Sequence, residues 1–190
     1  MIGKIKSIIS ESIQTKQALV ENDALLKTMD ELAQVIVRSL KNNGRVYFCG
    51  NGGSAADAQH LAAELSGRFY HDRPALAGEA LHCNTSYLTA VANDYSYDVV
   101  YKRYIDGVGR PGDVLIGIST SGNSKNIVAA LDAAKTKQMI TVSLTGAKGG
   151  LMKDQCDFWL PAASNDTPRI QETHILVGHI LCQLVEEYYF

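Results

Sequence analysis

Residues 113–124 read Asp-Val-Leu-Ile-Gly-Ile-Ser-Thr-Ser-Gly-Asn-Ser, an apolar run that ends in a loop rich in hydroxyl groups. Such a run is typical of a strand that is covered on both faces of a parallel sheet. A helical pattern follows from Ile127 to about Lys137, so the loop joins a strand to a helix. Hydroxyl groups and the free N–H groups at the start of a helix suit a phosphate monoester. The stretch therefore predicts a phosphate-binding loop, and an ordinary strand-to-helix turn is the alternative.

A second strand–loop–helix unit lies earlier in the chain. Residues 45–49 form a short apolar run, the loop Gly50-Asn51-Gly52-Gly53-Ser54 follows it, and a helical pattern extends from Ala55 to about Ser66. Further strands are predicted at 140–144 and 157–161, and a last helix at 167–187. Apolar strands that alternate with helices indicate an α/β fold with a parallel sheet. Functional sites in such sheets lie beyond the carboxyl ends of the strands, where both loops fall.

Two amphipathic helices are predicted ahead of the first strand, within residues 1–44. Their apolar faces comprise Ile5, Ile8, Ile9 and Ile13 in the first helix and Leu25, Leu26, Met29, Leu32, Ile36, Val37 and Leu40 in the second. We expect partner subunits to cover these faces. The chain is expected to form one domain over residues 1–190, with the leading helices at 1–44 and an α/β core at 45–190.

Composition and charge exclude several classes of protein. The chain has 190 residues, 46% of them hydrophobic, which is typical of a folded domain rather than a disordered chain. Its 18 Lys and Arg residues against 20 Asp and Glu residues give a net charge of −2, without the basic excess of nucleic-acid-binding proteins. The 4 cysteines form no CxxC pair, and no segment resembles a signal peptide or a membrane span of about 20 apolar residues. We therefore expect a soluble, cytoplasmic protein that binds neither nucleic acid nor a membrane.

Five segments together resemble the sugar isomerase (SIS) domain family and, within it, the phosphoheptose isomerases. They are Gly50–His60, Ala63–Arg68, Ala92–Asp94, Gly112–Ser124 and Thr167–His174. The resemblance implies an SIS-type three-layer α/β/α sandwich preceded by two N-terminal helices. It also implies an isomerase that converts sedoheptulose 7-phosphate to D-glycero-D-manno-heptose 7-phosphate. That reaction is the first step toward the ADP- or GDP-heptose precursors of lipopolysaccharide and other surface glycans.

The resemblance also implies roles for individual residues. Glu64 and His179 match the catalytic pair of the family, and His60, Glu64, Gln171 and His179 match the ligands of one zinc ion (Zn²⁺) per subunit. The residues implied to bind the substrate are Asn51, Gly52, Gly53, Ser54, Glu64, Asn93, Asp94, Ser119, Thr120, Ser121, Ser124 and Gln171. The implied assembly is a homotetramer with its sites between subunits.

The spacing of the implied zinc ligands limits how they can meet. His60 and Glu64 are four residues apart in a helical pattern, so they are neighbours on one face and can share a divalent ion; a solvated helix face is the alternative. Gln171 and His179 are eight residues apart, about 12 Å along one helix. We expect that different subunits supply them or that the site forms only when a neighbouring subunit packs. His174 is the nearest rival of His179, and a core position is the alternative for either.

The implied reaction moves a proton from C1 to C2 of the sugar through a cis-enediol, which requires a base and an acid. Glu64 is the predicted base, and His179 is predicted to move protons among the oxygens, while zinc would polarise the carbonyl group. One alternative is a non-catalytic SIS protein that binds a phosphosugar or a protein partner, such as the replication-initiator-associated proteins. Those proteins generally lack counterparts of Glu64 and His179. Another alternative is an isomerase of a hexose or pentose phosphate.

Overall fold

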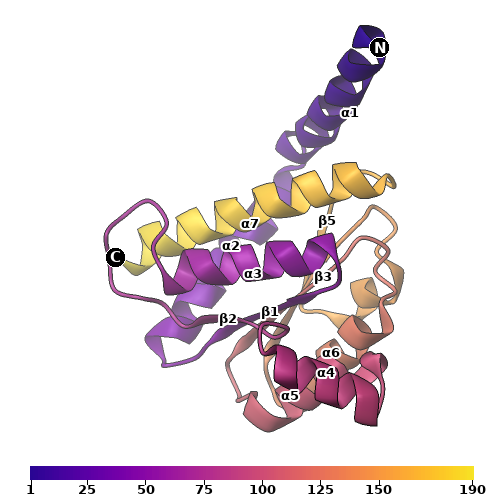
Figure 1. Ribbon diagram of the computed structural model, residues 1–190. Helices are drawn as coiled ribbons and strands as arrows, with labels where there is room; N and C mark the ends of the chain where they lie inside the picture. The colour runs from indigo at the N-terminus through magenta and orange to yellow at the C-terminus, as the bar shows by residue number, and fades with distance from the viewer.

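A parallel sheet of five strands forms the centre of the computed structural model, which describes all 190 residues (Figure 1). The strands are β1 (Val46–Gly50), β2 (Gly78–Ala80), β3 (Val114–Ser119), β4 (Ile140–Thr145) and β5 (Phe158–Pro161). Their order is β2-β1-β3-β4-β5, and every neighbouring pair is parallel. The predicted parallel sheet is thus confirmed, and β2 is a strand that the sequence pattern did not reveal.

Helices cover both faces of the sheet (Figure 1). On one face lie α2 (Asp23–Lys41), α3 (Gly53–Ser66) and α7 (Thr167–Tyr189), and on the other α4 (Thr85–Asp94), α5 (Val100–Val108) and α6 (Lys125–Thr136). Two short 3-10 helices, η1 (Tyr97–Val99) and η2 (Gly150–Gln155), complete the second layer. The predicted three-layer α/β/α sandwich is confirmed.

The side chains of each strand point alternately into two separate hydrophobic cores, one on each face of the sheet. In β1, Phe48 packs into the core under α2, α3 and α7, while its neighbour Tyr47 packs into the core under α4, α5 and α6. In β3, Ile116 and Leu115 divide in the same way. Successive side chains of a strand point to opposite faces, so strands buried on both faces must be apolar throughout. This is why β1 and β3 could be read from the sequence as continuous apolar runs.

The register of the strands places the two predicted loops side by side. Gly50, the last residue of β1, pairs with Ile118, and Ser119 of β3 pairs with Thr145 of β4. Since β1 and β3 are neighbours that end at the same level, the loop after β1 and the loop after β3 emerge together at the carboxyl edge of the sheet.

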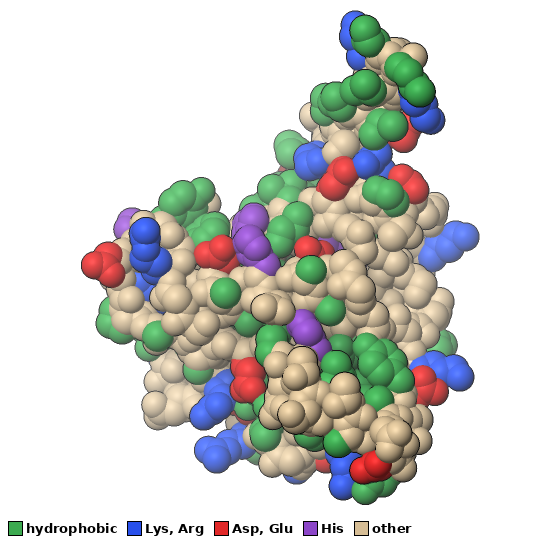
Figure 2. Space-filling view, in the orientation of Figure 1, with side chains coloured by type: hydrophobic (Ala, Val, Ile, Leu, Met, Phe, Trp, Pro, Cys, Tyr) green, Lys and Arg blue, Asp and Glu red, His purple; other side chains and the backbone are tan.

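The two leading helices differ in how they are covered. The apolar face of α2 is largely buried within this chain, with Met29, Leu32 and Ile36 at most 2% exposed, so no partner subunit is needed to cover it. The other leading helix, α1 (Ile2–Val20), buries only Thr15 and Leu19 and protrudes from the molecule (Figure 1). Figure 2 shows exposed hydrophobic side chains along this helix. The expectation of a partner-covered face is therefore wrong for α2 and remains a prediction for α1.

None of the helices combines the length and the hydropathy of a transmembrane segment.

Candidate functional site

The loop after β1, residues Asn51–Ser54, turns the chain into α3. Gly52 has a φ of +56°, in the left-handed region that residues with a Cβ rarely adopt. The hydroxyl group of Tyr101 donates a hydrogen bond of 2.6 Å to the carbonyl oxygen of Gly50, which fixes the end of the strand. Ser54, in the first turn of α3, is buried. The predicted glycine loop is therefore a turn that leads directly into a helix.

Three serine hydroxyl groups converge in the loop after β3. The Oγ atom of Ser119 lies 2.9 Å from that of Ser124 and 3.4 Å from that of Ser121. They lie at the start of α6, where free N–H groups and the helix dipole favour an anion. Gly122 has a φ of +66°, and a Cβ there would overlap the carbonyl oxygen of Gly149. The loop therefore gathers hydroxyl groups at the start of a helix, and the backbone at Gly149 packs against it at Gly122. Phosphate binding at this loop stays a prediction.

A pair of asparagines links the two loops. Asn51 and Asn126 exchange hydrogen bonds through their side-chain amides, at 2.9 and 2.8 Å. The hydroxyl group of Tyr97 also donates to Asn51 Oδ1, at 3.1 Å. Sequence reasoning missed Asn126 and Tyr97, since neither belongs to a recognisable motif. The only available signal was the position of Asn126 just after the serine loop.

The predicted sugar-binding residues Asn93 and Asp94 lie at the end of α4. Both are exposed, and the amide of Asn93 donates to the carboxylate of Asp94 at 2.9 Å. Tyr97, which contacts the glycine loop, follows three residues after Asp94. The hydrogen bond from Tyr97 therefore holds the segment that follows α4 against the glycine loop.

A cluster of possible metal ligands lies between α3 and α7. His60 Nε2 is 3.0 Å from Glu64 Oε1 and 3.0 Å from His179 Nε2. One ligand atom from each of the three residues lies within 4.8 Å of the others. Figure 2 shows histidine side chains at the surface beside these two helices. The contact confirms the prediction that His60 and Glu64 are neighbours on one face of α3. His179, on α7, lies against the same pair.

His179 is held between other groups in this cluster. Its ring stacks on that of Phe69, with centroids 5.7 Å apart and an angle of 29° between the planes. Burial lowers the pKa of His179, and the neighbouring His60 lowers it further, while Glu64 opposes the shift. The lowered pKa favours the neutral imidazole, which is the form that binds a metal ion.

Gln171, the fourth predicted ligand, contacts a different part of α3. Its side-chain nitrogen lies 2.6 Å from the position that a Cβ on Gly53 would occupy. Gly53 begins α3, whereas His60 lies about two helical turns further along it. A single chain therefore brings three of the four predicted ligands together and holds the fourth at the glycine loop.

His174, the predicted rival of His179, is a core residue. Its side chain is 1% exposed, and its Nε2 lies 3.0 Å from the carbonyl oxygen of Thr145 on β4. It faces the sheet and not the cluster, so the alternative reading of a core histidine applies to it.

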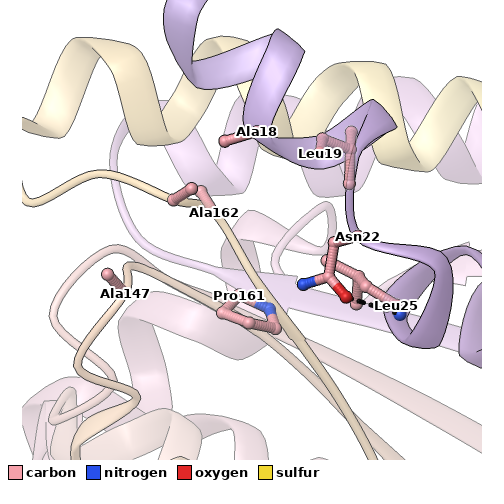
Figure 3. Close-up of a pocket in the computed structure, with 8 residues that line it drawn as sticks. Ala18, Leu19, Asn22, Leu25, Ala147, Pro161 and Ala162 are labelled. Atoms are coloured by element: carbon pink, nitrogen blue, oxygen red, sulfur yellow. Dashed lines mark hydrogen bonds between the residues drawn. The ribbon is translucent and has the colours of Figure 1, made fainter.

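An apolar pocket lies elsewhere, where α1 meets α2 (Figure 3). Leu19, Leu25 and Pro161 contribute to its wall, and Asn22 is its only side chain with polar atoms. The side-chain oxygen of Asn22 accepts a hydrogen bond from the backbone N–H of Leu25 and so caps α2. With no titratable group in its wall, this pocket offers no acid–base chemistry.

Comparison with known proteins identifies the family of this chain. The family model of the SIS domain matches residues 9–146. Phosphoheptose isomerase from Aneurinibacillus thermoaerophilus is 49% identical over 186 residues, which cover 98% of this chain and 94% of the relative. Phosphoheptose isomerase from Rhodospirillum rubrum is 55% identical over 157 residues, which cover 83% of this chain and 84% of the relative.

Solved structures show the same relationship. Phosphoheptose isomerase GmhA from Neisseria gonorrhoeae has a TM-score of 0.91 at 40% identity, covering 97% of this chain and 98% of that chain. A phosphoheptose isomerase from Francisella tularensis has a TM-score of 0.92 at 34% identity, covering 98% of both chains. These matches leave no long segment of the chain unaccounted for. This chain therefore belongs to the SIS domain family and, within it, to the phosphoheptose isomerases.

Proposed function

We propose that this isomerase converts sedoheptulose 7-phosphate to D-glycero-D-manno-heptose 7-phosphate, and so begins the synthesis of heptose precursors for surface glycans. The observation that carries the proposal is the cluster of His60, Glu64 and His179 on helices that pack beside the two loops. Ligand atoms of Glu64 and His179 lie within 4.8 Å of each other, and a carboxylate beside an imidazole can provide the base and the acid of an aldose–ketose isomerisation. The family name of the relatives agrees with this reaction.

In the proposal, the loops bind the phosphate end of the open-chain sugar. The hydroxyl groups of Ser119, Ser121 and Ser124 and the start of α6 provide donors without a positively charged side chain. Thr120, Asn51, Gly52, Gly53 and Ser54 border the same region, and Asn93 and Asp94 are assigned to the sugar hydroxyls. The phosphate lies at the opposite end of the sugar from C1, so its binding energy orients the reacting carbons without taking part in the chemistry.

The three clustered residues fit a zinc ion. Imidazole nitrogens and a carboxylate oxygen are ligands that zinc prefers, and their separations require only small side-chain movements to surround one ion. We propose one zinc ion per subunit, with Gln171 as the fourth ligand. When bound, zinc supplies a Lewis acid that polarises the sugar's carbonyl group.

The proton transfers are assigned to Glu64 and His179. Glu64 takes a proton from C1 of the ketose and returns one to C2, while His179 takes the proton of the C1 hydroxyl group and delivers one to the oxygen at C2. The C1 oxygen becomes the aldehyde and the C2 oxygen becomes a hydroxyl group, so no atom is gained or lost. Glu64 is also a proposed metal ligand, and the two roles compete for the same carboxylate.

We propose that the working form is a homotetramer whose sites lie between subunits. Two observations support assembly: the bare apolar face of α1, and the position of Gln171 away from the three clustered ligands. Either a partner subunit supplies the fourth ligand, or packing of that subunit moves Gln171 of this chain toward the cluster.

Incubation of the purified protein with sedoheptulose 7-phosphate, with and without a chelator, tests the proposal. We expect an aldose heptose 7-phosphate to form, its formation to stop on chelation, and zinc to restore it. Absence of the aldose would leave a non-catalytic phosphosugar-binding protein. Product formed only from hexose or pentose phosphates would assign the chain to another sugar phosphate.

A further inference from the structure

The longest segment without regular secondary structure, residues 67–77, connects α3 to β2 and passes beside the metal-ligand cluster. This connecting segment carries Phe69, whose ring stacks on that of His179. Irregular segments are mobile unless side chains hold them, because their backbone groups lack the hydrogen bonds of helices and sheets. The position of Phe69, and with it the orientation of His179, therefore depends on what holds the connecting segment.

Glu186, near the end of α7, binds the backbone of the connecting segment. Its carboxylate accepts hydrogen bonds from the backbone N–H groups of Phe69 at 3.4 Å, Tyr70 at 2.8 Å and His71 at 3.1 Å. It also accepts one from Nε of Arg73 at 2.8 Å. The Glu186 side chain is 1% exposed and its four contacts are part-buried, and a hydrogen bond to a charged group is stronger than a neutral one.

Arg73, in the connecting segment, binds the backbone at the end of α3. Its guanidinium group donates to the backbone carbonyl oxygens of Leu65 at 2.8 Å and Glu64 at 2.7 Å, both in the last turns of α3. It also donates to those of Gly67 and Pro74, and its side chain is 3% exposed. One guanidinium group thus joins α7, the connecting segment and the end of α3.

A buried ion pair of this kind contributes little net stability, because the desolvation of its two charges offsets their attraction. Removing two charges from water carries a large free-energy cost, and apolar replacements of buried pairs are often as stable or more so. The contacts of Arg73 and Glu186 instead hold backbone segments in place. They fix two backbone elements at the cluster: the connecting segment, whose Phe69 stacks on His179, and the turn of α3 that carries Glu64.

We propose that Arg73 and Glu186 are positioning residues that hold Phe69 against His179 and fix the turn of Glu64. Glu186 lies seven residues after His179, two turns along the same helix, so the ion pair and the imidazole share one rigid element. This inference rests on the proposed function of His179 and Glu64. Displacement of a reacting group by about 1 Å lowers a rate by up to about a hundredfold, so a modest shift of the imidazole is measurable.

Four variants test the inference. Glu186→Gln removes the charge at constant size, Arg73→Lys cannot make the forked contacts, and Phe69→Leu removes the ring, whereas Phe69→Tyr retains it. We expect the first three to lower kcat roughly tenfold to a hundredfold. Their KM for sedoheptulose 7-phosphate should stay within about twofold, because the phosphate loops are not touched. Phe69→Tyr should retain kcat.

A second readout reports geometry without activity. The NMR signals of the His179 ring protons carry a ring-current shift from Phe69, and this shift should be lost in Glu186→Gln, Arg73→Lys and Phe69→Leu. The matched control is Leu131→Ala, which weakens the core on the other face of the sheet and should change neither kcat nor the His179 signals. Unchanged kcat and an unchanged His179 signal in folded Glu186→Gln and Arg73→Lys would overturn the inference.

The remaining outcomes are also decisive. If the two ion-pair variants do not fold, the difference between Phe69→Leu and Phe69→Tyr in kcat and in the His179 signal decides the role of the ring, and equal behaviour overturns the inference. If the wild-type protein converts no sugar phosphate, the proposed function fails and the NMR comparison alone decides. A drop in kcat that Leu131→Ala reproduces would mean general destabilisation and would count against positioning.

Discussion

The imidazole of His174 is bound to the sheet by a single hydrogen bond, from its Nε2 to the carbonyl oxygen of Thr145 at 3.0 Å. Its other nitrogen, Nδ1, is buried without a partner. A carbonyl oxygen only accepts, so Nε2 carries a proton, and a second proton on the buried Nδ1 would find no acceptor, which favours the neutral ring. Burial lowers the pKa of His174 to about 4, and the hydrogen bond to Thr145 opposes the shift only in part.

The first prediction concerns stability in acid. The unfolded chain takes up a proton at His174 below about pH 6.5, whereas the folded protein resists protonation until about pH 4. The unfolded state thus binds more protons between these values, and stability falls as the pH falls. From pH 7 to pH 5 the loss due to His174 is about 2 kcal/mol. Denaturant unfolding at both pH values, at fixed protein concentration, measures it.

The matched variant for this measurement is His174→Gln, which can still donate to the Thr145 carbonyl oxygen but does not titrate. Its stability should depend less on pH than that of the wild type, by the same margin. Parallel stability curves for the two proteins between pH 7 and pH 5 would contradict the assignment of His174 as a neutral core residue.

The second prediction concerns the link between the loops. Asn126→Ala removes both hydrogen bonds between the two side chains, and each bond of this kind contributes about 0.5–1.5 kcal/mol at a part-buried site. Because this pair sets the spacing of the two loops, KM for the sugar phosphate should rise roughly tenfold, with a smaller change in kcat. Steady-state kinetics measure both. The control is Asn42→Ala at the end of α2, and a KM unchanged in Asn126→Ala would show that the loops keep their spacing without the pair.

Local features of this structure could be predicted from the sequence. The apolar runs at β1, β3 and β4 identified those strands to within one residue at each end. The contact between His60 and Glu64 follows from helix periodicity alone, since i and i+4 side chains are always neighbours. These features depend on residues a few positions apart, where backbone geometry leaves few arrangements.

Long-range contacts could not be predicted in this way. His60 meets His179 across 119 positions, Arg73 meets Glu186 across 113, and Asn51 meets Asn126 across 75. Each contact depends on how two helices or loops pack on the sheet, and no local pattern specifies that. The strand β2 has only three residues, Gly78–Ala80, too few for a periodic signal.

The third prediction concerns the proposed base. Glu64→Gln keeps the size of the side chain and removes its ability to accept a proton, so turnover should fall by about two to four orders of magnitude. Binding of the sugar phosphate, measured by calorimetry, should change by less than about threefold, because the phosphate loops remain intact. The control is Glu187→Gln, an exposed carboxylate on α7. Near-normal turnover in Glu64→Gln would end the assignment of this residue as the base.

The fourth prediction concerns α1 and the proposed assembly. Every residue from Met1 to Glu11 is exposed, and Ile5 and Ile9 are 55% and 54% exposed in the single chain. A helix with so little support is marginal in water, and each fully buried isoleucine would contribute about 1.5–3 kcal/mol. The double substitution Ile5→Asp with Ile9→Asp should therefore convert the proposed tetramer to smaller species in sedimentation velocity.

The same variant tests whether the site depends on assembly. Ile5 and Ile9 lie on a protruding helix, so their replacement leaves the cluster of this chain unaltered. If a neighbouring subunit supplies or moves Gln171, activity and zinc affinity should fall together with the assembly, and both should recover at protein concentrations that restore it. Lys6→Glu, on the same helix, is the control that changes charge and not the apolar face. A dissociated variant with full activity and full zinc affinity would mean that one chain forms the entire site.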